Sequence, residues 1–158
     1  MTRPVNELVQ AFTAGTLPRH EWTHHAHLTV GLWHVLQAPS PGEALEALRR
    51  GIRRYNVATG TENTDCQGYH ETITRFYVGL IQHFLQHADR RQPIDALAAE
   101  LIARHGERSL LGRHYSRKLL DSSAARLHWH EPDRRPLPAA QPRGTSTESS
   151  NSASGTNT

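Results

Sequence analysis

The stretch "YHETITRFYVGLIQHFLQHA", residues 69–88, is the most informative part of the sequence for the fold class. Large apolar side chains recur in it at intervals of three and four residues, and a half-buried strand would instead alternate apolar and polar residues. The residues that share this face are Ile73, Tyr77, Leu80, Ile81 and Phe84. The pattern predicts an amphipathic helix that packs against other helices.

The same periodicity recurs before and after this stretch, and glycine or proline residues mark the expected helix ends. The segment "SPGE", residues 40–43, is typical of a helix start, with Ser40 as the N-cap and Glu43 three positions later. Residues 59–68 are rich in turn formers, so we expect a loop there. Helices are predicted over residues 4–14, 21–37, 41–58, 69–88 and 93–106, with short helical turns within residues 108–131.

No segment shows the strict alternation of a half-buried strand. We therefore expect an all-α fold, a compact bundle of four to five helices that forms one domain over residues 1–140. Residues 141–158 are mostly Ser, Thr, Gly and Asn, and they contain no aliphatic residue larger than alanine. Such a segment buries too little apolar surface to offset the entropy of ordering, so we expect a disordered tail.

Composition narrows the class of protein further. The chain has 158 residues and a formal net charge of +3, from 18 basic and 15 acidic residues. Its one cysteine, Cys66, cannot form an internal disulfide, and residues 1–10 lack the pattern of a signal peptide. No apolar run approaches the roughly 20 residues that span a bilayer. We expect a soluble, cytoplasmic protein with no membrane partner.

Four arginines form the densest basic patch. Arg49, Arg50, Arg53 and Arg54 fall on one side of the predicted 41–58 helix, opposite its apolar side. This distribution is typical of an ordinary solvated helix face. A site for a phosphate or an acidic partner is the alternative, but the small charge excess does not favour nucleic acid binding.

The segment "EWTHHAHLTVGLWHV", residues 21–35, places histidines on the apolar side of a predicted helix. An unsatisfied buried polar group costs about 1–3 kcal/mol, so these imidazoles need partners. His24 and His27 are three residues apart, which lets both side chains reach one point. His34 shares their face, Gly31 gives a neighbouring helix room to approach, and His25 points toward the edge.

His70 lies on the apolar face of the 69–88 helix, near its start. Helix N-termini disfavour the charged imidazolium, and the neutral imidazole is the form that binds metal. We therefore hypothesise that His24, His27 and His70 bind one divalent metal ion. Zinc is the first choice, with iron, manganese, nickel and copper as alternatives. His25 or His34 could replace one ligand, and hydrogen-bonded core histidines are the alternative to any metal site.

Two carboxylates lie close in sequence to these histidines. Glu21 precedes His24 by one turn, and Glu71 directly follows His70. Each could be a fourth ligand, an acceptor that orients an imidazole, or a general base acting on metal-bound water. The alternatives are an ion pair of Glu71 with Arg75 and a favourable interaction of Glu21 with the helix dipole.

The leading hypothesis is a metal-dependent enzyme that acts on a small molecule through the three histidines, with Glu71 or Glu21 moving the proton. Both a hydrolase-type reaction and a non-haem metal oxidoreductase fit this residue set. The rival is a non-catalytic helical module that binds a ligand or partner through the Arg49–Arg54 face. A third hypothesis is haem or another cofactor held by one histidine. Substrate, reaction and oligomeric state stay open.

Overall fold

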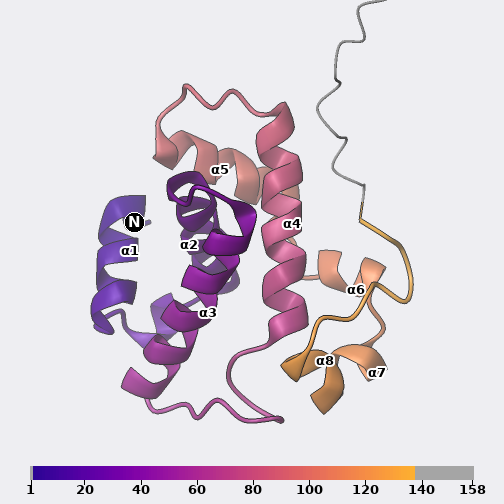
Figure 1. Cartoon of the computed structure of the whole chain (residues 1–158). Helices are drawn as coiled ribbons and strands as arrows, with labels where there is room; N and C mark the ends of the chain where they lie inside the picture. Colours follow the sequence, from indigo (N-terminus) through magenta and orange to yellow (C-terminus); the bar gives the residue numbers. More distant parts are fainter. Residues whose placement is uncertain (1, 138–158) are drawn as a thin grey trace, which may run out of the picture.

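The computed structural model describes residues 2–137, and within them the chain forms α-helices and no strand (Figure 1). The prediction of an all-α protein is confirmed. The predicted tail, residues 141–158, lies outside the described residues. None of the described helices is long and apolar enough to cross a membrane.

Five longer helices make up most of the described chain, and three short ones follow them. A 3-10 turn over Arg19–Glu21 precedes the second helix. The longer helices are α1 (Val5–Ala14), α2 (His24–Gln37), α3 (Pro41–Ala58), α4 (Glu71–His87) and α5 (Ile94–His105). The short helices are α6 (Leu110–His114), α7 (Arg117–Leu120) and α8 (Ser123–Leu127).

Two predicted helix signals are confirmed by hydrogen bonds. Gly15 ends α1 with φ 71°, in the left-handed region that glycine adopts without a steric penalty. At the start of α3 the Ser40 hydroxyl accepts a hydrogen bond from the Glu43 amide at 3.2 Å and donates one to the Glu43 carboxylate at 2.9 Å. Local sequence is therefore sufficient to set these boundaries.

The second helix begins three residues later than predicted. The Thr23 hydroxyl accepts a hydrogen bond from the Ala26 amide at 3.2 Å, so Thr23 is the N-cap and His24 is the first helical residue. Glu21 belongs to the preceding 3-10 turn. His24 and His27 thus lie in the first turn of α2.

Helix α2 lies in the middle of the described fold and packs against α1, α3, α4 and α5 (Figure 1). Its side chains Leu28, Val30 and Leu32 are almost completely buried. At Gly31 an added Cβ would lie 2.9 Å from Ile81 Cδ1 of α4. The prediction that Gly31 allows a neighbouring helix to approach is therefore confirmed.

The C-terminal short helices pack beside the start of α4 (Figure 1). Thr72 of α4 donates a hydrogen bond to the His128 carbonyl at 2.8 Å and accepts one from the His130 amide at 3.1 Å. The Tyr115 hydroxyl donates to the His130 carbonyl at 2.7 Å. These bonds fix the segment after α5 against α4, and its first part, residues 108–111, closes one side of the candidate site.

Candidate functional site

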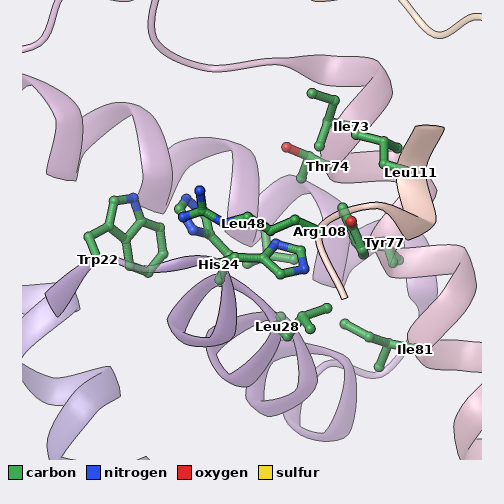
Figure 2. A pocket seen from close by; sticks show the side chains of 13 residues that line it. Trp22, His24, Leu28, Leu48, Ile73, Thr74, Tyr77, Ile81, Arg108 and Leu111 are labelled. Atoms are coloured by element: carbon green, nitrogen blue, oxygen red, sulfur yellow. The ribbon is translucent and has the colours of Figure 1, made fainter. Parts of the chain in front are cut away.

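A cavity of about 400 Å³ lies between α2, α3, α4 and the segment around residues 108–111 (Figure 2). Most of its wall is apolar, and its polar side chains come from α2, α4 and the segment before α6. The apolar lining includes Trp22, Leu28, Leu48, Ile73, Val78, Ile81 and Leu111, and the polar lining consists of His24, His27, Thr74, Tyr77 and Arg108. An apolar cavity with a few converging polar groups is typical of small-molecule sites.

His24 contributes a buried ring nitrogen that has no partner. Its Nε2 atom makes no hydrogen bond with any of the described residues. The ring is directed toward Tyr77, and the two ring centroids are 5.4 Å apart (Figure 2). Burial lowers the pKa of His24, and the nearby charges of His25 and Arg108 lower it further. A neutral imidazole with one unsatisfied nitrogen therefore faces the cavity.

His27 is oriented by its own helix. Its Nδ1 atom lies 2.8 Å from the Thr23 carbonyl oxygen, so Nδ1 carries the hydrogen and the neutral ring keeps a lone pair on Nε2. Its ring packs against Trp22, with 3.8 Å between the centroids. Burial lowers the pKa of His27, and the hydrogen bond to Thr23 opposes this effect. His27 is nevertheless an exposed residue, because the cavity opens beside it, so the surrounding protein atoms lower its pKa without closing it off from solvent.

Arg108 and Tyr77 complete the polar lining. Within residues 2–137 Arg108 makes no ion pair or hydrogen bond, and its acidic neighbour Glu107 pairs with Arg113 at 3.0 Å. Burial raises the pKa of Tyr77 to about 12, so its hydroxyl stays protonated at neutral pH. Neither residue was predicted as a site residue, since Tyr77 fits a packing role and Arg108 lies between helices where no periodicity applies.

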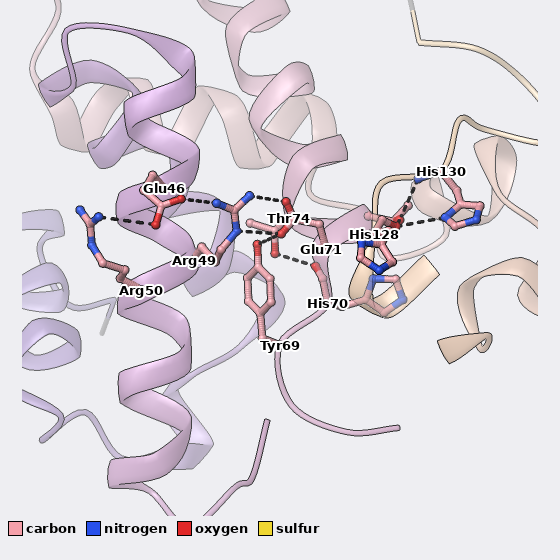
Figure 3. A network of polar contacts seen from close by, with 10 residues as sticks. Glu46, Arg49, Arg50, Tyr69, His70, Glu71, Thr74, His128 and His130 are labelled. Atoms are coloured by element: carbon pink, nitrogen blue, oxygen red, sulfur yellow. Dashed lines mark hydrogen bonds and ion pairs between the residues drawn. The ribbon is translucent and has the colours of Figure 1, made fainter. Parts of the chain in front are cut away.

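His70, the third predicted metal ligand, is not among the residues that line this cavity. Figure 3 shows it directly before Glu71, at the start of α4. Its Nε2 atom lies 2.8 Å from the Leu120 carbonyl oxygen, and its Nδ1 atom accepts a hydrogen bond from the Ile73 amide at 3.2 Å. His70 is thus the N-cap of α4, with both ring nitrogens in hydrogen bonds. Within the described residues no three His, Cys, Asp or Glu side chains are arranged to hold a metal ion.

The two predicted catalytic carboxylates also lie outside the cavity and are in ion pairs. Glu71 pairs with Arg49 and accepts a hydrogen bond from the Tyr69 hydroxyl at 2.7 Å (Figure 3). Burial raises the pKa of Glu71, but the hydrogen bonds from Arg49 and Tyr69 outweigh it, so the net shift is downward. Glu21 pairs with Arg3 at 3.0 and 3.1 Å. Neither carboxylate is placed to act on a molecule in the cavity.

The predicted pair of Glu71 with Arg75 is wrong. Glu71 reaches across to α3 instead, and Arg75 lies over the Trp129 ring, 4.8 Å from its centroid. Helical spacing identifies neighbours on the same helix, but it does not show that Arg49 on another helix is the stronger partner.

The predicted basic face is partly neutralised. Arg49 pairs with Glu71 and Glu46, and Arg50 pairs with Glu46 at 3.5 Å. Arg53 lies over the Tyr69 ring, 5.0 Å from its centroid. Arg49 is therefore a structural residue between α3 and α4 rather than part of a solvated face.

A second group of histidines gathers between α4 and α5. His83 and His87 are four residues apart on α4, with ring centroids at 5.0 Å, and they line a cavity of about 330 Å³ with His105 of α5. The Nδ1 atom of His83 is buried and has no partner among the described residues. In the sequence, the four-residue spacing of His83 and His87 indicates that these two side chains lie on one face of a helix.

Comparison of the chain with models of protein families, with curated proteins and with solved structures gave no match.

Proposed function

We propose that this protein binds a small organic molecule in the cavity between α2 and α4. The observation that carries the proposal is the buried, unpartnered Nε2 atom of His24 in an otherwise apolar cavity of about 400 Å³. A buried polar atom without a partner costs about 1–3 kcal/mol, and a ligand that hydrogen-bonds to it removes this cost. The volume is within the usual range of about 300–1,000 Å³ for small-molecule sites.

Different lining residues would contact different parts of the ligand. The apolar wall, with Leu28, Leu48 and Ile81, takes the body of the ligand. His24 and His27 supply two neutral imidazoles at one end, and the Nε2 atom of His27 can only accept a hydrogen bond because Nδ1 donates to Thr23. A ligand with a polar end and an apolar body matches this division.

The proposal is tested by a fragment screen with saturation-transfer NMR on wild-type protein and two variants. His24→Ala removes the unpartnered nitrogen, and His25→Ala is the matched control because His25 is exposed and does not line this cavity. We expect polar fragments to bind wild type and His25→Ala alike and to weaken by roughly tenfold in His24→Ala. Fragments that bind all three proteins equally would contradict the proposal.

A metal-dependent enzyme with fewer protein ligands is the second candidate. Metal-binding histidines usually donate their other ring N–H to a carbonyl or carboxylate, and His27 does so to Thr23 at 2.8 Å. With His24 beside it, two nitrogens would bind the metal, and water or substrate would complete the coordination. This candidate leaves His70 out of the set, because both of its nitrogens are in hydrogen bonds.

Zinc titration of four proteins tests this candidate. If it holds, His24→Ala and His27→Ala each abolish stoichiometric zinc binding, whereas His70→Ala retains it. Circular dichroism on the same samples separates ligand loss from unfolding. Equal zinc binding by wild type and His24→Ala would eliminate the candidate.

A further inference from the structure

Among the described residues that line the His24 cavity, Arg108 is the only Arg, Lys, Asp or Glu. Its side chain reaches the cavity from the segment before α6 (Figure 2). Within residues 2–137 its guanidinium makes no ion pair or hydrogen bond; Arg108 is exposed, as are other arginines without such a partner, but Arg108 is the one that lines this cavity. The cavity therefore has an uncompensated positive charge at its edge.

The carboxylates nearest in sequence to the cavity residues are already in ion pairs. Glu107 pairs with Arg113 at 3.0 Å, Glu21 pairs with Arg3 at 3.0 Å, and Glu71 pairs with Arg49. The charge of Arg108 is felt inside the cavity, since it is one of the causes that lower the pKa of both His24 and His27. A negative group in the cavity would therefore interact favourably with Arg108.

We infer that the bound molecule is a monocarboxylate with an apolar body, held by Arg108 and His24; this inference rests on the proposed function. The planar guanidinium matches a carboxylate with two parallel hydrogen bonds. The Nε2 atom of His24 donates a further hydrogen bond in the tautomer that places the hydrogen there. A single arginine balances one negative charge, so a carboxylate fits better than a phosphate dianion.

Tyr77 and the apolar wall fit the same ligand. Tyr77 keeps its hydroxyl proton at neutral pH because burial raises its pKa to about 12, so it is a neutral donor beside His24. The apolar wall formed by Leu28, Ile73 and Ile81 excludes a ligand that is polar throughout. A ligand with a carboxylate at one end and a hydrocarbon body matches both the polar side chains and the apolar wall.

The test is a panel of arylalkanoic and branched alkanoic acids, each with its primary amide, its alcohol and the corresponding phosphate monoester. Binding is measured by calorimetry, and amide chemical-shift changes show where each compound binds. We expect the best acids to bind at the cavity at least tenfold more tightly than their amides, alcohols and phosphates, since a hydrogen bond to a charged group is stronger than a neutral one. Arg108→Gln should remove this preference.

Arg113→Gln is the matched control, because Arg113 is a nearby exposed arginine that does not line the cavity. It should leave the preference for acids unchanged. If amides and alcohols bind at the cavity as tightly as acids and Arg108→Gln has no effect, the inference is wrong and the proposed function stands. Tighter binding by the phosphates also overturns the inference. If no compound of the panel shifts the cavity resonances, both the inference and the proposed function fail.

Discussion

His24 and His70 both lie at the start of a helix, but their ring nitrogens differ in what they contact. Both nitrogens of His70 are satisfied by the backbone, one by Leu120 and one by Ile73. The Nε2 atom of His24 has no such partner and lies at the cavity. We therefore propose a ligand-binding role for His24, whereas the hydrogen bonds of His70 stabilise the start of α4.

Replacing His70 tests this difference. His70→Ala removes the N-cap of α4 and leaves the Leu120 carbonyl without its donor, so we expect a loss of about 1–2 kcal/mol in the free energy of unfolding. Asparagine is a strong N-cap, so His70→Asn should recover part of this loss. Urea denaturation measures both. A full loss of stability in both variants would show that the cap is not what His70 contributes.

The lowered pKa of His70 also predicts how the stability of wild type and of His70→Ala changes with pH. Burial lowers the pKa of His70 below its ordinary value of 6.5. The unfolded chain then takes up the proton first, so this stabilisation is present above pH 6.5 and is lost as the pH falls from there through the folded pKa. We expect the stability of His70→Ala to depend less on pH in this range than that of wild type. An identical pH dependence would contradict the shift.

The ion pair of Glu71 with Arg49 gives a second prediction for a single residue. Glu71→Gln keeps the side-chain shape but removes the charge, and it should cost about 1–3 kcal/mol at pH 7 because the Glu71 carboxylate is largely buried. Since the pKa of Glu71 is lowered, the contribution is present above its ordinary value of 4.5 and is lost as the pH falls through the folded pKa. The difference from wild type should therefore shrink at low pH.

Glu46→Gln is the control for this pair, because Glu46 also pairs with Arg49 but its side chain is 45% exposed. Exposed ion pairs contribute about 0–1 kcal/mol, so its effect should be smaller. Equal losses in the two variants, measured by urea denaturation, would show that burial of Glu71 does not set the strength of the pair.

At the scale of the elements, helix positions were predictable because their signals are local. Gly15 and the Ser40 cap act within a few residues, and periodicity identified Leu80, Ile81 and Phe84 on the buried face of α4. The predicted histidine face of α2 is wrong in part, because α2 is also buried at Ala26, Val30 and Leu32 whereas His27 is exposed. The start of α2 was predicted at residue 21, but Glu21 lies in the 3-10 turn and Thr23 is the N-cap. Only the bond from the Ala26 amide to Thr23 distinguishes them.

The contact of α2 with α4 at Gly31 gives a prediction at this scale. An added Cβ would lie 2.9 Å from Ile81 Cδ1, so Gly31→Ala forces the two helices or the Ile81 side chain to shift. We expect a loss of about 1–3 kcal/mol in stability, the usual cost of overpacking a core. Gly112→Ala in α6 is the control, since its Cβ would meet nothing within 4 Å. Thermal unfolding of both variants measures the difference, and equal effects would contradict the close contact.

At the scale of the whole molecule, the sequence predicted two of the cavity histidines but not their surroundings. His24 and His27 share a helix, so their spacing was informative. The partners of His70 and Glu71 come from residues 50 and 22 positions away, which no helical periodicity encodes. Arg108 reaches the cavity only because the segment after α5 folds against α4. The arrangement of the helices therefore determines which polar groups meet.

A crystal structure of the protein soaked with a mixture of polar organic fragments tests whether the His24 cavity binds a small molecule. We expect electron density for a fragment inside the cavity, with a polar atom about 2.7–3.2 Å from the Nε2 atom of His24. Crystals of His24→Ala soaked in the same way should lose that density. Fragments bound only elsewhere on the molecule, with the wild-type cavity holding water alone, would contradict the claim that this cavity is the functional site.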